Sequence, residues 1–103
     1  MYRQRIRQQI LYGQFREYIE IAEEVIRLRR KLGLAAPVLW VPTFGTSNEV
    51  VWETDYPDLA TFQRDNETFY SDAEAMKQWR RLWQFAVQGS VRDELLEEAP
   101  HIA

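Results

Sequence analysis

The chain has 103 residues, of which 46% are hydrophobic, 14% aromatic and 28% charged. This length suits one domain over residues 1–103 with a single hydrophobic core, and the composition is that of a globular protein. Thirteen basic residues stand against sixteen acidic ones, so the formal net charge is −3. Such a balance provides no bulk attraction to nucleic acid or to an anionic membrane.

Two reactive residue types are nearly absent. The chain has no cysteine, and its single histidine is His101, close to the end. Disulfides, thiolate metal sites, cysteine nucleophiles and multi-histidine metal sites are therefore excluded, and we expect no metal and no cofactor. The opening residues are basic but no apolar signal segment follows them. We expect a cytoplasmic, soluble protein with no membrane insertion and no nucleic-acid partner.

The first part of the chain shows two different periodicities. Over residues 2–11, arginines alternate with apolar and amide side chains, which predicts a strand with one face toward a core. Gly13 interrupts this pattern. Over residues 15–32, apolar side chains recur every three or four positions, which predicts an amphipathic helix that ends at Gly33.

The next segments are short apolar runs. Residues 38–41 and 49–54 flank the turn-forming residues 44–48, and the pair is predicted to form a hairpin. Pro37 and Pro42 lack a backbone donor, which places the first of these strands at a sheet edge.

The last part of the chain predicts a helix in two segments and one more strand. Pro57 begins the helix, and a second segment begins at a capping box of Ser71 and Glu74 and ends at Gly89. Residues 91–96 form a weak final strand, and residues 97–103 form a polar tail.

This order of elements, βαββαβ, predicts a ferredoxin-like α+β fold. Four antiparallel strands in the order 4-1-3-2 have both helices on one face. The other face is left uncovered and carries Val, Leu or Trp side chains whichever way the strands face. Because so much exposed apolar area generally needs a partner, we expect a homodimer formed by two sheets.

Two segments resemble a known family. Residues 2–7, and residues 48–62 from Asn48 through Trp52 and Pro57, are similar to the NIPSNAP-like branch of the dimeric α+β-barrel superfamily. The resemblance implies a ferredoxin-like protomer and a dimer whose two sheets form a barrel. It implies no settled reaction, because relatives include cofactor-independent monooxygenases, haem-degrading enzymes and proteins of unclear chemistry. A haem-degrading relative would offer an axial histidine in its pocket, and the only histidine here is His101, so we expect no haem.

Charged side chains on the strands are the first candidates for a site. Arg5 and Arg7, with Arg3, share one face of the first strand and could hold a carboxylate or phosphate inside the barrel. Alternatively, they pair across strands with Glu53 and Asp55 of the third strand. Glu53 is also the best candidate for acid–base chemistry.

Aromatic side chains are the second candidates. Trp40 and Trp52 lie on strands with two faces and could line a ligand pocket. Trp79 and Trp83 share a helical stripe, which indicates core positions, although Trp83 is kept as a candidate. Tyr12 precedes Gly13 at a helix start, which could meet an anion or be a simple turn.

We therefore predict a homodimeric barrel that binds a small, partly apolar or anionic organic ligand. The candidate ligand-binding residues are Arg5, Arg7, Tyr12, Trp40, Trp52, Glu53 and Trp83. One alternative is a cofactor-independent monooxygenase or isomerase, and another is a non-catalytic structural or interaction module, so enzymatic activity is left open. A void of several hundred Å³ lined by Trp and Arg would favour a ligand, whereas a filled interior with Arg–Glu pairs would favour the module.

Overall fold

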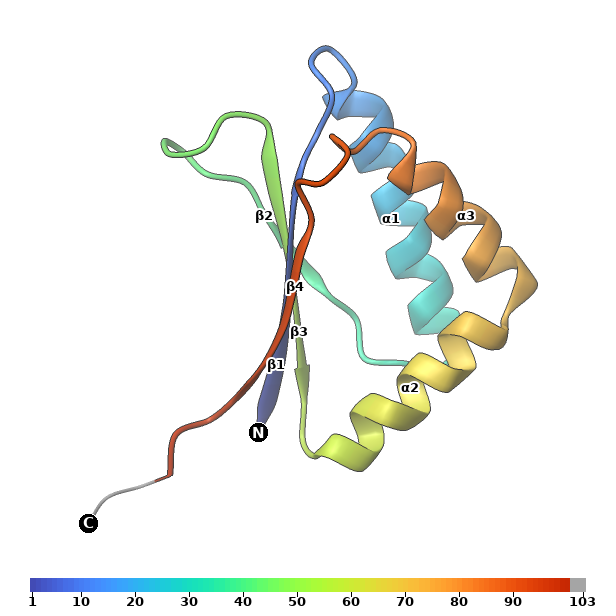
Figure 1. The fold of residues 1–103 in the computed structure, drawn as a ribbon. Coiled ribbons are helices and arrows are strands. Elements are labelled where there is room, and N and C mark those ends of the chain that lie inside the picture. Colours follow the sequence, from blue (N-terminus) through green and yellow to red (C-terminus); the bar gives the residue numbers. More distant parts are fainter. Residues whose placement is uncertain (101–103) are drawn as a thin grey trace.

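The computed structural model describes residues 1–100 and consists of one antiparallel sheet with helices on one of its faces (Figure 1). The elements are β1 (Tyr2–Gln9), α1 (Phe15–Lys31), β2 (Val38–Trp40), β3 (Glu49–Tyr56), α2 (Leu59–Ser71), α3 (Ala73–Trp83) and β4 (Arg92–Glu97). The four strands lie in the order β2-β3-β1-β4. This order is the predicted one and confirms the ferredoxin-like fold. His101, in the predicted tail, lies outside the described residues. No helix within residues 1–100 is long and apolar enough to cross a membrane.

The alternation in β1 and β3 assigns each side chain to one face of the sheet. In β3, Val50, Trp52, Thr54 and Tyr56 are buried toward the helices, and the residues that alternate with them face the other way. β1 pairs with β3 so that Arg5 lies opposite Glu53. Successive side chains of a strand point to opposite faces, so all the arginines of β1 lie on the face without helices. We call this the open face.

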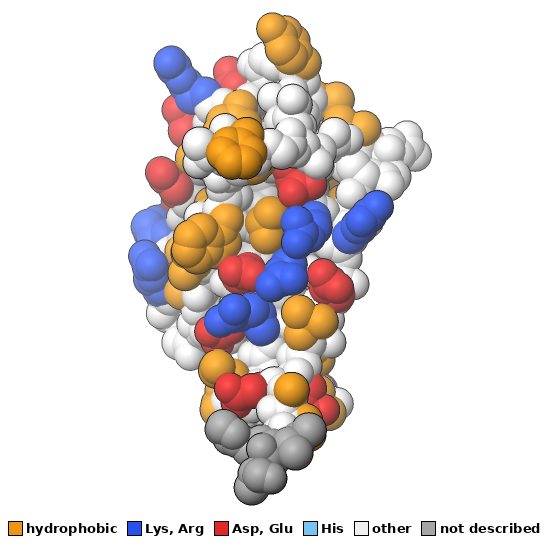
Figure 2. Space-filling model, turned by 90° about the vertical axis from the view of Figure 1, so that its left-hand side faces the viewer, with side chains coloured by type: hydrophobic (Ala, Val, Ile, Leu, Met, Phe, Trp, Pro, Cys, Tyr) orange, Lys and Arg blue, Asp and Glu red, His pale blue; other side chains and the backbone are white. Residues whose placement is uncertain are grey.

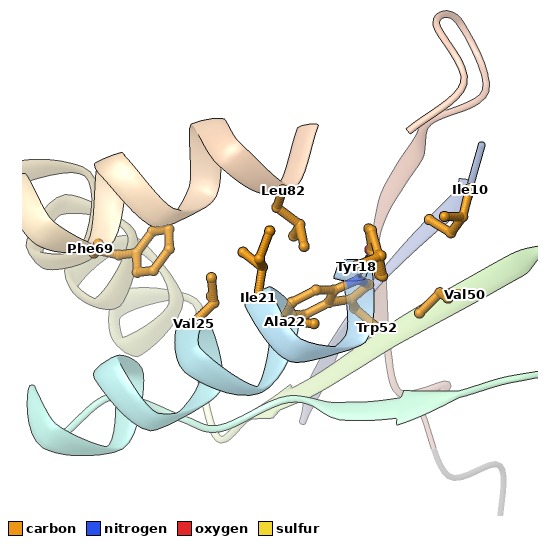
Figure 3. Close-up of a cluster of buried hydrophobic side chains, with 10 residues drawn as sticks. Ile10, Tyr18, Ile21, Ala22, Val25, Val50, Trp52, Phe69 and Leu82 are labelled. Atoms are coloured by element: carbon orange, nitrogen blue, oxygen red, sulfur yellow. Dashed lines mark hydrogen bonds between the residues drawn. The ribbon is translucent and has the colours of Figure 1, made fainter. Parts of the chain in front are cut away.

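The helices cover the other face with their apolar stripes. Tyr18, Ala22 and Val25 of α1 are fully or almost fully buried, and Leu82 of α3 has an exposed fraction of 0%. Figure 3 shows these side chains pointing into one layer between the helices and the sheet, where Trp52 of β3 lies beside Tyr18 and Ala22. The result is one core between a single sheet face and three helices.

The helix predicted after Pro57 is bent into α2 and α3, as the sequence indicated, but the capping residue differs. Ser71 is the last residue of α2, and Asp72 caps α3 by accepting a hydrogen bond from the Ala75 amide at 2.8 Å. The predicted capping box of Ser71 and Glu74 is therefore wrong by one position. Asp72 has the extended backbone (φ −89°, ψ 120°) that an N-cap residue requires, whereas Ser71 is still helical.

Strand β2 has only three residues and lies at the edge of the sheet, as its flanking prolines predicted. Its Val38 and Trp40 side chains are 55% and 54% exposed, and they extend the open face beyond β3.

Candidate functional site

Four aromatic side chains line a cleft between the sheet and the helices. Trp52 of β3, Phe69 and Tyr70 of α2 and Trp79 of α3 form its walls. Their rings meet edge to face, with centroids 5.6 Å apart for Trp52–Trp79 and 5.7 Å apart for Phe69–Trp79. This geometry is the favourable one for aromatic pairs and holds the walls in place. The volume of the cleft is about 40 Å³, below the several hundred Å³ that would favour a bound ligand by size alone, so a ligand has to lie across its open mouth.

One charged side chain lies in this cleft. Arg29 of α1 is only 8% exposed, and its guanidinium carbon lies 5.1 Å from the centre of the Phe69 ring. Its Nε donates to the Ala35 carbonyl at 2.8 Å, and one Nη donates to the Tyr56 hydroxyl at 3.2 Å. Among residues 1–100, no carboxylate oxygen lies within 4.0 Å of an Arg29 guanidinium nitrogen, so Arg29 forms no ion pair there. Its charge is thus held by a carbonyl, a hydroxyl and an aromatic face.

A buried carboxylate fixes the same loop from the other side. Asp65 of α2 is 5% exposed and accepts a hydrogen bond from the Ala35 amide at 2.9 Å. Arg29 and Asp65 therefore bind the two backbone groups of one residue in the connection between α1 and β2. This arrangement holds the segment that contains Pro37, which lines the cleft.

Sequence reasoning missed Arg29 and Asp65, although a signal was present. Arg29 stands four residues after Val25 and seven after Ala22, on the apolar stripe of its helix. Asp65 stands three residues after Phe62 and four before Phe69 in the same way. A charged residue in register with an apolar stripe is rare unless it is paired or functional, and that register could have identified both.

The open face carries rows of opposite charges. Arg3 binds Asp55 with two hydrogen bonds of 2.7 and 3.1 Å, and Arg5 binds Glu53 at 2.8 Å. The Arg3 guanidinium holds the pKa of the Asp55 carboxyl below its usual value. The cross-strand pairing predicted as an alternative is therefore present.

Arg7 pairs differently from the other two arginines of β1. Its Nη1 lies 3.3 Å from an oxygen of Glu49, because the residue directly opposite Arg7 is Val51. Figure 2 shows positive and negative side chains together over the middle of this face, with hydrophobic side chains around them.

The seven residues predicted to bind a ligand do not form one group. Arg5, Arg7, Trp40 and Glu53 share the open face, where a hollow of about 470 Å³ lies beside Trp40. Trp52 is on the opposite face, 3% exposed, and lines the cleft. Tyr12 is 92% exposed at the turn before α1.

The two tryptophans of α3, both predicted to be core residues, differ from each other in burial. Trp79 is partly buried against the core, whereas Trp83 is 41% exposed, so the core prediction is wrong for Trp83. Trp83 is the last residue of α3, and its ring meets the Trp79 ring edge to face at a centroid distance of 5.9 Å.

A buried polar network fixes Trp52 beside the cleft. Trp52 Nε1 donates to the Tyr18 hydroxyl at 2.7 Å, and this hydroxyl donates to Gln8 Oε1. Burial raises the pKa of Tyr18 above its ordinary value, so the hydroxyl remains protonated and can donate. The indole orientation is thus set from the core side.

Comparisons with solved structures identify the same fold in other proteins. An uncharacterised NIPSNAP domain protein from Burkholderia xenovorans is 18% identical with a TM-score of 0.79, over 100% of this chain and 99% of that one. A NIPSNAP family protein from Agrobacterium tumefaciens is 17% identical with a TM-score of 0.77, over 95% of this chain and 92% of that one. An antibiotic biosynthesis monooxygenase is 14% identical with a TM-score of 0.76, over 97% of this chain and 100% of that one.

No family model matches the chain, and no curated protein matches it in sequence. At these identities, the likeness establishes the fold alone. The ferredoxin-like protomer that the NIPSNAP-like resemblance implied is therefore confirmed.

Proposed function

We propose that this chain is a NIPSNAP-like binding protein that holds a small organic anion with an apolar body across the open mouth of its cleft. Arg29 carries the proposal. A buried guanidinium that meets no carboxylate within residues 1–100 is a costly arrangement, and an anionic ligand beside it would offset that cost. The aromatic walls would hold the apolar part of the ligand, and Asn66 at the cleft offers an amide to orient its polar end.

The side chains in the cleft favour binding over proton transfer. Among residues 1–100, no carboxylate and no histidine lines it, and these are the residue types that most often act as general bases. Monooxygenase or isomerase activity is therefore the second proposal, and its support is the fold that this chain shares with an antibiotic biosynthesis monooxygenase.

A titration with small carboxylates tests the cleft. Benzoate is the probe and benzyl alcohol is its uncharged counterpart, with the NMR signals of the tryptophan indole N–H groups as readout. We expect benzoate to shift the Trp52 and Trp79 signals more than benzyl alcohol does. Arg29→Met keeps the length of the side chain and should weaken benzoate binding about tenfold, the effect of losing one charge-assisted hydrogen bond. Arg5→Met, on the open face, is the matched control. Equal affinities of the wild type and Arg29→Met would refute the assignment.

We also propose a homodimer formed through the open face. Val38, Trp40 and Val51 supply apolar area there, and the charges of β1 are already paired with those of β3, so two such faces can meet without repulsion. Because Arg5 and Glu53 satisfy each other, we assign them to this interface and not to the ligand.

Light scattering tests the dimer. Trp40→Glu places a charge in the proposed interface and should convert the dimer to a monomer, whereas Leu59→Glu on α2 should not. A wild-type protein that is monomeric at micromolar concentration would contradict the proposal.

A further inference from the structure

Three connections meet at one end of the sheet. Residues 10–15, 41–48 and 82–91 include the turns before α1, between β2 and β3, and after α3, and they lie at the upper end of the molecule in Figure 1. The Ile10 amide donates to the Asn48 carbonyl at 2.7 Å, and the Leu11 amide donates to the Phe85 carbonyl at 2.8 Å. These backbone bonds join the three segments into one surface, which we call the loop end.

The loop end has no charged side chain. None of its residues is Asp, Glu, Lys, Arg or His, although 28% of the chain is charged. Solvent-exposed connections are ordinarily rich in charge, so this composition needs an explanation other than solubility.

Aromatic side chains form the tips of the loop end. Tyr12 and Phe44 are each 92% exposed, more than any other large hydrophobic side chain within residues 1–100. The turns that present them contain Gly13 (φ 82°) and Gly45 (φ 136°), backbone conformations that other residues rarely adopt. Trp83 adds a third exposed ring. The turn geometry therefore holds apolar rings away from the core.

Arginines border the loop end. Arg16 follows its first segment directly, and Arg81 and Arg92 flank its last one. All three are exposed, and within the described residues none has a carboxylate oxygen within 4.0 Å. The arginines of β1 are by contrast paired with acids. Positive charge with no carboxylate bound to it thus lies next to the loop end, and the acid that borders the loop end, Glu49, is paired with Arg7.

We propose that the loop end docks on the surface of an anionic lipid bilayer. The rings of Tyr12 and Phe44 would enter the interfacial region, which favours aromatic side chains, and Arg16, Arg81 and Arg92 would lie at the level of the headgroups. A bilayer fits both features at once, because its apolar region lies beneath a layer of negative charge. Docking of this kind needs no membrane-spanning segment. It also leaves the cleft free, since no residue that lines the cleft belongs to the loop end.

Co-sedimentation with vesicles tests this proposal. The wild-type protein should sediment with vesicles of phosphatidylcholine and phosphatidylserine, less with phosphatidylcholine alone, and less as salt is added. Phe44→Ser and Tyr12→Ser should each weaken binding about tenfold, the effect of no longer burying one ring. Arg16→Gln should weaken binding about fivefold, and only to vesicles that contain phosphatidylserine.

Leu59→Ser is the control variant. It removes a side chain that is 42% exposed at the start of α2, at the other end of the molecule, and should bind vesicles like the wild type. Three results would overturn the proposal: no sedimentation of the wild type with either vesicle, wild-type binding by Phe44→Ser, or equal losses from Leu59→Ser and Phe44→Ser. If Phe44→Ser dissociates a dimer without changing vesicle binding, the loop end contacts a second copy of the chain instead, and the proposal fails.

Discussion

Removing the Tyr18 hydroxyl should destabilise the protein far more than the loss of one oxygen suggests. Tyr18 has an exposed fraction of 0%, and its hydroxyl accepts from Trp52 Nε1 and donates to Gln8 Oε1. Tyr18→Phe leaves both of these atoms without that partner in the core. A buried polar group without a partner costs about 1–3 kcal/mol, and the hydroxyl's own desolvation cost is removed, so we expect a net loss of about 2–4 kcal/mol.

Gln8→Leu provides the contrasting variant. Gln8 is fully buried, and its Nε2 has no hydrogen-bond partner among residues 1–100. A leucine of similar volume removes this unpaired amide but also the acceptor of the Tyr18 hydroxyl, which still accepts from Trp52, so a gain and a loss oppose each other. The free energy of unfolding should therefore stay within about 1 kcal/mol of the wild type. The double variant Tyr18→Phe/Gln8→Leu should lose less than the sum of the two single changes, because one orphaned atom has gone.

Urea unfolding monitored by circular dichroism measures these differences. All variants are compared at one protein concentration, because any dimer makes the apparent stability concentration-dependent. The midpoint should fall for Tyr18→Phe with an unchanged m-value. A loss below about 1 kcal/mol for Tyr18→Phe, or an equal loss for Gln8→Leu, would refute the reasoning from unpaired buried atoms.

Three further outcomes follow from other contacts. Burial raises the pKa values of Tyr18 and Tyr56, so the folded state keeps protons that the unfolded chain loses above about pH 10. The free energy of unfolding should therefore be constant below that pH and fall above it, which urea unfolding curves at alkaline pH would measure. The Asp55 carboxyl should titrate below its usual range by NMR and return to it in Arg3→Gln, whereas an unchanged titration would mean that their hydrogen bonds do not form in solution. Asp72→Ala removes the cap of α3 and should lower the free energy of unfolding by about 1 kcal/mol, as measured by thermal unfolding, whereas the control Ser71→Ala should have little effect. A larger loss from Ser71→Ala than from Asp72→Ala would mean that Ser71 is the cap.

The sheet and its pairing could be predicted from local pattern because strand geometry has a strict period of two. Once Ile6 and Gln8 face the core, Arg3 and Arg5 must face away, and β3 must turn Trp52 inward and Glu53 outward. The pairs Arg3–Asp55 and Arg5–Glu53 then follow from the register. The edge position of β2 was also predictable from local sequence, because Pro37 and Pro42 lack the backbone N–H that a central strand needs.

Tertiary packing decided the candidate site. Nothing within α1 shows that Arg29 meets Phe69 and Tyr56, because those contacts come from α2 and β3, which the fold brings against it. Trp79 and Trp83 look alike on one helical stripe, yet the neighbouring α2 packs on Trp79 and leaves Trp83, at the helix end, half exposed. The alternation of side chains is a local property of the backbone, whereas burial of a charge or an aromatic ring depends on which distant element packs on it.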